Sequence, residues 1–289
     1  MKLLHKLMFV VIIVVSCLFV SNAFAEDDEI ACPDDLDAGG IRCYKVLDTV
    51  CGGSERKGAL IYYPSDIASL PDGSVGATTV TSGKTGRLPS VQWVGEAIAT
   101  AGMVACLVDA VENTTIPGYE TAHETGLAIL QAEENDPDSP LYGKLGDFGL
   151  IGYSLGGSAA LKVGSDQGDQ VKAVIALAPY DNVDYSPEVD AIDLTAATMI
   201  LTGAKDGTST PDITSVIFDG IPENVPRLYA LVKRKRHLFW ARNTNPGQTD
   251  DLIVAWMKYY VERDGNYLGT IKNPGWQFTN YEYISMDSE

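Results

Sequence analysis

The chain has 289 residues and a formal net charge of −18 at pH 7, with 39 acidic residues against 21 lysines and arginines. So large an excess of negative charge argues against nucleic acid and anionic membrane surfaces as partners. The chain shows no linker, repeat or low-complexity tract, and its length suffices to bury the core of one large domain.

The first 25 residues have the features of a secretion signal. Lys2 and Lys6 precede an apolar stretch at residues 7–20, and Ala23-Phe24-Ala25 provides a small-x-small cleavage site. Cys17 loosely fits a lipoprotein signal, but apolar residues continue beyond it, so cleavage after Ala25 is favoured. The sequence thus predicts a secreted or periplasmic protein in which residues 26–289 form a single, monomeric domain without a stable membrane anchor.

Four cysteines remain after this cleavage, namely Cys32, Cys43, Cys51 and Cys106. Export permits disulfides, the even count fits them, and three pairings are possible. A local bridge among the first three is favoured, while Cys106 lies in an apolar run and is interpreted as a buried thiol. No C-x-x-C pair or nearby histidine indicates a metal site, so no metal is expected.

Short apolar runs alternate with helical patterns along the rest of the chain. Strands are predicted at 59–63, 75–81, 103–108, 148–153, 171–177, 198–203 and 228–232, and helices at 90–101, 119–134, 154–164 and 249–263. This alternation predicts an α/β fold with a mostly parallel central sheet and helices on both faces. Residues 41–50 and 59–63 have no helix between them, which predicts an antiparallel N-terminal hairpin at one edge.

The most informative motif is Gly152-Tyr153-Ser154-Leu155-Gly156, which reads G-x-S-x-G. It lies between a predicted buried strand and a predicted helix, the strand–turn–helix context that holds a nucleophilic serine clear of the backbone. A structural glycine-rich turn is the alternative. The context favours Ser154 as a nucleophile.

A nucleophilic serine needs a base to accept its proton and a third group to orient that base. The chain has three histidines, and His5 lies in the signal. His123 lies in a predicted helix whose glutamates indicate a solvated face, and it precedes the serine. His237 follows the last predicted strand of the sheet, in agreement with the order Ser, acid, His. We therefore expect His237 to be the general base, with an ordinary surface histidine as the alternative.

The acid should lie between Ser154 and His237. Asp206 follows the predicted strand 198–203 and opens a turn, and acids at the carboxyl ends of parallel strands face the ligand crevice. Asp181 and Asp184 follow another strand and compete with it. Asp206 is preferred, although a loop aspartate can also simply cap its own turn.

The oxyanion of the reaction needs two backbone donors. One should be the N–H of Leu155, directly after the nucleophile. The other should come from the loop that follows an earlier strand, and residues 81–86, with glycines that permit close backbone approach, form such a loop. A flexible surface connection is the equally supported alternative for this loop.

Residues 59–267 resemble the α/β-hydrolase superfamily, and within it the secreted cutinase-like polyester hydrolases and the dienelactone-hydrolase-like group. The resemblance is carried by the G-x-S-x-G motif, by Gly203-Ala204-Lys205-Asp206 and by Ala255-Trp256-Met257-Lys258-Tyr259-Tyr260-Val261. It implies an α/β-hydrolase fold and a triad of Ser154, Asp206 and His237. It further implies that the backbone N–H groups of Lys84 and Leu155 bind the oxyanion, and that Tyr180 forms one wall of the substrate site.

The chain also departs from the family pattern. Lys84 stands where the family has a tyrosine that clamps aromatic substrates, and Tyr180 stands where it has a tryptophan. The family's C-terminal disulfide has no counterpart, because no cysteine follows Cys106. The run Lys233-Arg234-Lys235-Arg236 replaces small residues before His237. With Lys84 and Arg87 this run could steer an anionic ester, but the favoured interpretation is solvated charge paired with surplus surface acids.

The sequence thus predicts a serine hydrolase of small or polymeric carboxylic esters that needs no metal or organic cofactor. Cysteine-dependent dienelactone hydrolysis is excluded in its usual form, because Ser154 holds the nucleophile position. Two alternatives stay open. One is another acyl-enzyme chemistry, such as that of a peptidase or an acyltransferase. The other is an inactive binding module on the same fold.

Overall fold

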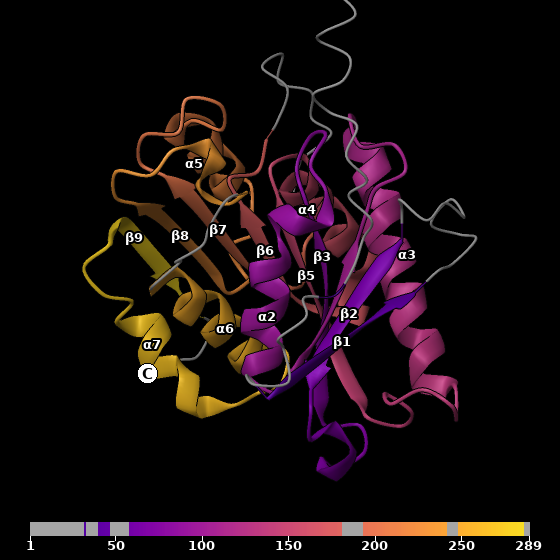
Figure 1. Ribbon diagram of the computed structural model, residues 1–289. Helices are drawn as coiled ribbons and strands as arrows, with labels where there is room; N and C mark the ends of the chain where they lie inside the picture. Colours follow the sequence, from indigo (N-terminus) through magenta and orange to yellow (C-terminus); the bar gives the residue numbers. More distant parts are fainter. Residues whose placement is uncertain (1–31, 33–39, 47–57, 181–192, 242–247, 286–289) are drawn as a thin grey trace, which may run out of the picture.

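The computed structural model describes residues 32, 40–46, 58–180, 193–241 and 248–285 (Figure 1). Within them, nine strands form one sheet in the order β1-β2-β4-β3-β5-β6-β7-β8-β9. The strands are β1 (Ile41–Val46), β2 (Ala59–Pro64), β3 (Val75–Thr81), β4 (Val104–Val108), β5 (Leu145–Tyr153), β6 (Val171–Leu177), β7 (Ala197–Gly203), β8 (Arg227–Val232) and β9 (Phe278–Ile284).

The sheet is mostly parallel, as predicted. β4, β3, β5, β6, β7 and β8 pair in parallel. β1 and β2 form the predicted antiparallel hairpin, and β2 also pairs antiparallel with β4. β9, which was not predicted, adds an antiparallel strand beside β8 at the opposite edge.

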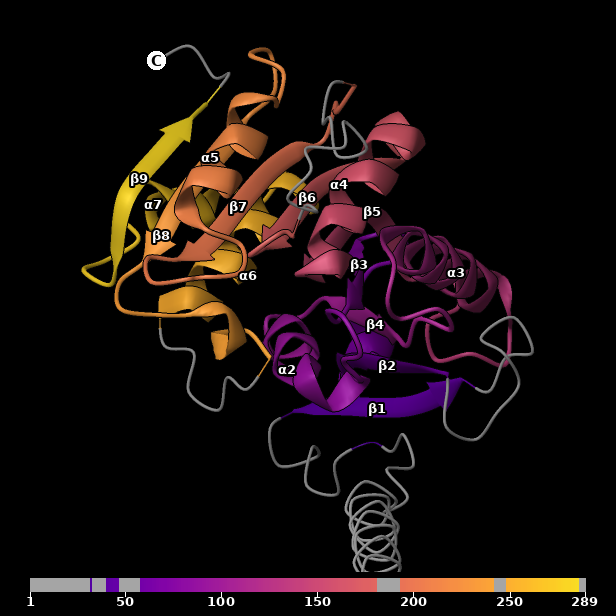
Figure 2. The ribbon, with the colours of Figure 1, turned by 90° about the horizontal axis from the view of Figure 1, so that it is seen from above.

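Helices cover both faces of the sheet. They are α2 (Gln92–Thr100), α3 (Ile116–Asn135), α4 (Leu155–Gln167), α5 (Pro211–Asp219), α6 (Gln248–Tyr260) and α7 (Leu268–Lys272), with 3-10 turns η3 (Ile67–Ser69), η4 (Leu88–Ser90), η5 (Gly168–Gln170), η7 (His237–Phe239) and η8 (Gly265–Tyr267). Buried residues of α2, α6 and α7 pack in one core cluster, and those of α3, α4 and α5 pack in two others. The ribbon shows these two groups of helices on opposite faces of the sheet (Figure 2). Of these helices, α5 and α7 were not predicted.

The β2 strand shows why the central strands are continuous apolar runs rather than alternating ones. Leu60 and Tyr62 belong to the core cluster of α2, while Ala59 and Ile61 belong to that of α3. Successive side chains of a strand point to opposite faces, so a strand covered on both sides has apolar residues on both faces. No helix in the described part of the chain combines the length and the apolar character needed to span a membrane.

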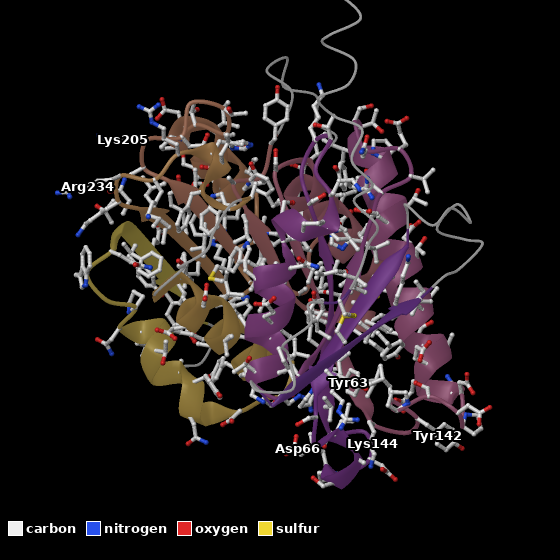
Figure 3. The ribbon with its side chains drawn as sticks, in the orientation of Figure 1. Tyr63, Asp66, Tyr142, Lys144, Lys205 and Arg234 are labelled. Atoms are coloured by element: carbon white, nitrogen blue, oxygen red, sulfur yellow. A yellow bond between two sulfur atoms is a disulfide. The ribbon has the colours of Figure 1, made fainter. Side chains whose placement is uncertain are left out.

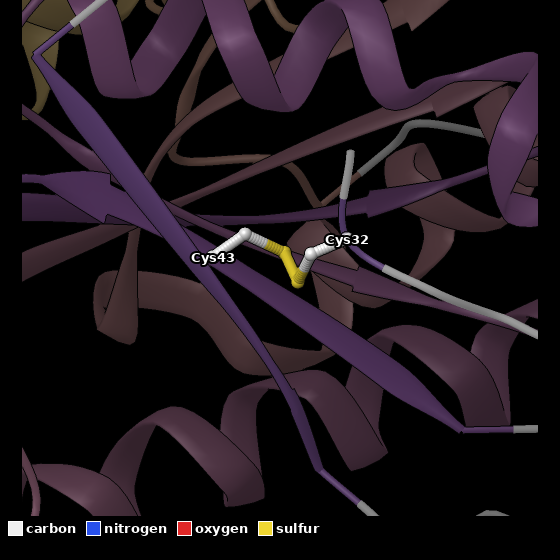
Figure 4. Close-up of a disulfide and its surroundings, with 2 residues drawn as sticks. All are labelled: Cys32 and Cys43. Atoms are coloured by element: carbon white, nitrogen blue, oxygen red, sulfur yellow. A yellow bond between two sulfur atoms is a disulfide. The ribbon is translucent and has the colours of Figure 1, made fainter. Parts of the chain in front are cut away.

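A disulfide joins Cys32 to Cys43 of β1, with the two Cα atoms 5.7 Å apart (Figure 4). The predicted local bridge is therefore confirmed, and one of the possible pairings is selected. Cys106 is buried in β4, as expected. Cys51 lies outside the described residues.

We predict that replacing both bridge residues, Cys32→Ser with Cys43→Ser, lowers the free energy of unfolding. The bridge spans a sequence separation of 11, for which chain entropy predicts a stabilisation of up to about 3 kcal/mol. Urea unfolding with and without reductant measures the effect, because reductant should destabilise the unchanged protein but not the double variant. Peptide mapping that found Cys43 bonded to Cys51 would contradict the assignment.

Candidate active site

Ser154 lies in a sharp turn between β5 and α4, with φ of 56° and ψ of −119°. Residues other than glycine rarely adopt such a positive φ, so the surroundings must hold it in place. The flanking glycines allow the turn to close. A Cβ on Gly152 would lie 2.0 Å from the carbonyl oxygen of Gly156, and one on Gly156 would lie 2.3 Å from Oγ1 of Thr81. The G-x-S-x-G pattern is thus a steric requirement of this turn.

The structure brings Ser154, His237 and Asp206 together in one chain of hydrogen bonds. Oγ of Ser154 lies 3.0 Å from Nε2 of His237, and Nδ1 of His237 lies 2.9 Å from Oδ2 of Asp206. The other carboxylate oxygen of Asp206 accepts hydrogen bonds from the backbone N–H groups of Thr208 and Ser209, at 2.8 and 2.9 Å. The Asp206 side chain is fully buried, so these bonds fix its orientation.

Two neighbouring parallel strands position Asp206 and His237. Asp206 follows β7, and His237 begins the η7 turn after β8. The two loops are bonded to each other, because the Lys205 N–H donates to the carbonyl of Lys235 at 2.9 Å. Beyond the histidine, the carbonyl of the fully buried Trp240 accepts from the indole N–H of Trp93 in α2 at 2.9 Å. The loop that carries His237 is therefore fixed by hydrogen bonds both before and after the histidine. The competing acids Asp181 and Asp184 lie outside the described residues.

The two residues expected to supply backbone donors both lie beside Ser154. Leu155 is the first residue of α4, where a backbone N–H has no partner within its helix. Lys84 follows Gly83, at which a Cβ would lie 2.7 Å from the Cβ of Ser154. The loop after β3 therefore packs directly on the turn that holds Ser154.

A cavity of about 480 Å³ opens above Ser154. It is lined by Gly83, Lys84, Thr85, Gly86, Ser90, Tyr153, Ser154, Leu155, Tyr180, Thr208, His237, Leu238 and Ala241. Tyr180 is half-buried, and its backbone N–H donates to the carbonyl of Ser154 at 3.1 Å. The ring of Tyr153 packs on that of His237, with centroids 5.2 Å apart. The site thus combines aromatic walls with the serine and histidine.

The prediction that His123 faces solvent is wrong, because this side chain is fully buried. Its Nδ1 lies 2.6 Å from Oγ1 of Thr79, and its Nε2 lies 2.9 Å from Oγ1 of Thr81 and 3.2 Å from the carbonyl oxygen of Gly156. Since that carbonyl can only accept, Nε2 carries the proton. His123 therefore links β3 to the first turn of α4.

The glutamates that suggested a solvated face lie on a neighbouring stripe of α3. The signal that was missed is the spacing of Tyr119, His123, Gly126 and Leu130, which recur three or four residues apart and are all buried. A histidine in such a stripe is a core residue.

The basic run before His237 is exposed along its length. Nζ of Lys233 donates to the carbonyl of Trp276 at 2.6 Å, and Nζ of Lys235 lies 4.4 Å from the ring centroid of Phe239. The ion pairs between described residues include none from this run to a carboxylate. Arg87, by contrast, pairs with Asp109 at 3.1 Å.

Burial lowers the pKa of His123 from 6.5 to about 4. Below about pH 6.5, His123 is therefore protonated in the unfolded chain while it stays neutral in the folded chain. The stability of the folded state that depends on neutral His123 is complete above about pH 6.5 and is lost as the pH falls toward 4. The loss is of the order of 3 kcal/mol, at about 1.4 kcal/mol per pH unit.

We predict that His123→Gln is destabilising at neutral pH and that its deficit relative to the unchanged protein shrinks as the pH falls through this window. Urea unfolding of both proteins at several pH values gives the difference, in which the titration of other groups cancels. A deficit that stays constant with pH would show that His123 is not held neutral.

The chain is similar to known ester hydrolases. A family model described as PET hydrolase-like matches residues 41–282. Cutinase 2 of Thermobifida cellulosilytica is 28% identical over 215 residues, which are 73% of this chain and 76% of the relative. Cutinase cut1 of Thermobifida fusca and bis(hydroxyethyl) terephthalate hydrolase of Streptomyces coelicolor are also 28% identical over 73% of this chain, and the match spans 62% and 64% of their own lengths. The chain therefore belongs to the PET hydrolase-like family of cutinase-like carboxylic ester hydrolases within the α/β-hydrolase superfamily.

Proposed function

We propose that this protein hydrolyses carboxylic esters through a covalent acyl-enzyme formed on Ser154. The observation that carries the proposal is the continuous chain of hydrogen bonds from the Ser154 hydroxyl through His237 to the buried carboxylate of Asp206, with distances of 3.0 and 2.9 Å. Because Nδ1 donates to the carboxylate, Nε2 is left as the acceptor for the serine proton.

In the acylation step, Ser154 Oγ attacks the ester carbonyl while His237 accepts its proton. The negative charge that develops on the carbonyl oxygen is bound by the backbone N–H groups of Leu155 and Lys84. The tetrahedral intermediate then collapses, and the alcohol leaves with the proton held by His237. A water molecule attacks the acyl-enzyme in the same way and releases the acid. Asp206 keeps the imidazole oriented and stabilises its charged form. These residues suffice for the reaction, so the proposal includes no cofactor.

The substrate is proposed from the relatives and the cavity together. The relatives are named as cutinases and as a bis(hydroxyethyl) terephthalate hydrolase. The cavity of about 480 Å³ presents Tyr180 and Leu238 as apolar walls, which suits an ester with an apolar acyl or alcohol part. Residues 1–25 serve, in this proposal, as the signal for secretion to an extracellular or periplasmic ester substrate.

We predict that the protein cleaves p-nitrophenyl esters and that Ser154→Ala lowers kcat by at least about a thousandfold. The measurement is p-nitrophenol release across a series from acetate to palmitate, whose optimum gives the preferred chain length. Ser165→Ala in the same helix is the matched control and should retain activity, because Ser165 does not line the cavity.

A fluorophosphonate probe should label the unchanged protein and the Ser165→Ala variant but not the Ser154→Ala variant. A folded protein that cleaves no ester would contradict the proposal. Labelling without ester hydrolysis would instead indicate a peptidase or an acyltransferase, and absence of labelling an inactive binding module.

A further inference from the structure

Lys84 is presented to the cavity by a loop whose backbone is held in place. The carbonyl of Gly83 accepts from the hydroxyl of the buried Tyr119 and from the N–H of Gly86. On the other side of the lysine, the N–H of Thr85 donates to the carbonyl of Asn113 at 2.8 Å. The Lys84 side chain itself is exposed and lines the cavity. Its ammonium group therefore extends on a flexible four-carbon stem from a fixed position beside Ser154.

Among the residues that the structure describes, the cavity lining has a cation but no carboxylate. The thirteen described lining residues include Lys84 and neither aspartate nor glutamate. Asp206 lies behind His237, fully buried and already hydrogen-bonded. The other cation of the same loop, Arg87, is engaged by Asp109 at 3.1 Å. Among the ion pairs between described residues, none involves Lys84.

Other positive groups adjoin residues of the cavity lining. α4 begins at Leu155, so the positive end of its dipole faces the cavity. The basic run Lys233 to Arg236 directly precedes His237 and is exposed, and its Lys235 is bonded through the backbone to Lys205. Figure 3 shows Lys205 and Arg234 at the same corner of the molecule. These are positive groups in a chain whose net charge is −18.

From this arrangement we infer that the site selects esters that carry a second, ionised carboxylate, that is, half-esters of dicarboxylic acids. The inference rests on the proposed function, since it names the substrate of that site. The Lys84 N–H binds the oxyanion while the Lys84 ammonium binds the distant carboxylate. The chain of carbons between the two ends lies against the apolar walls that Tyr180, Leu238 and Ala241 provide.

This substrate class has a defined chemical source. Each hydrolysis of one ester bond in a diester or polyester adds water, releases one hydroxyl end and leaves one new carboxylate. A half-ester is therefore what partial hydrolysis of such a compound produces. The enzyme would act after that step, on soluble anionic fragments, and would release the free dicarboxylic acid.

The test compares two substrates that differ only in charge: mono-4-nitrophenyl adipate and the same ester with its free carboxylate replaced by a carboxamide. An exposed ion pair is weak, so we expect the unchanged protein to prefer the anionic ester by about three- to fivefold in kcat/KM, mainly through KM. The preference should fall as salt is raised from about 10 mM to about 1 M, where charges are screened. Lys84→Gln should abolish it, and Lys84→Glu should reverse it.

The readout is the ratio between the two substrates within each variant, in which any effect on the oxyanion donor cancels. Lys272→Gln is the matched control, an exposed lysine on α7 outside the cavity lining, and should keep the ratio of the unchanged protein. An unchanged ratio in Lys84→Gln, or a preference of the unchanged protein for the carboxamide, would overturn the inference and leave the esterase proposal intact. Failure to cleave either ester would instead count against the proposed function.

Discussion

The backbone of Ser154 is the constraint on which the rest of the site depends. Its φ of 56° forces the chain to reverse between β5 and α4 within one residue. The turn is held by three hydrogen bonds: its N–H donates to the carbonyl of Leu177, and its carbonyl accepts from the N–H groups of Ser158 and Tyr180. These bonds join the turn to the end of β6, so the strained conformation is maintained by two strands at once.

The turn also constrains the segments packed against it, because it leaves little room around Ser154. The loop after β3 can approach only where it has no side chain, at Gly83, and α4 can begin only with Gly156 and Gly157 close to neighbouring backbone. His123 supports the same contact from the core, since one ring bonds to Thr81 and to the carbonyl of Gly156. The loop after β3 and helix α4 are therefore positioned by one another rather than separately.

Much of this site could be predicted from the sequence because its determinants are local or few. The strained turn requires glycines at fixed spacing, and the small number of histidines leaves His237 as the candidate base. The bounds of β3 and β6 agree with those predicted. By contrast, the burial of His123 depends on which face of α3 packs against β3. The glutamates on that helix make this buried face hard to identify from the sequence. The β9 strand, partly exposed at an edge, has an alternating pattern too weak to distinguish from a loop.

Lys84 shows how one residue of the site can carry two separable roles. Its backbone N–H is positioned by bonds of the neighbouring residues, so in the proposed reaction any side chain at this position leaves the oxyanion donor in place. The side chain is exposed and lines the cavity, where in this proposal it contacts the substrate. The family's aromatic residue at this position stacks on a ring, whereas an ammonium group attracts a carboxylate. In the proposed reaction, the charge at this single position therefore favours an anionic chain over an aromatic ring as the acyl part that binds best.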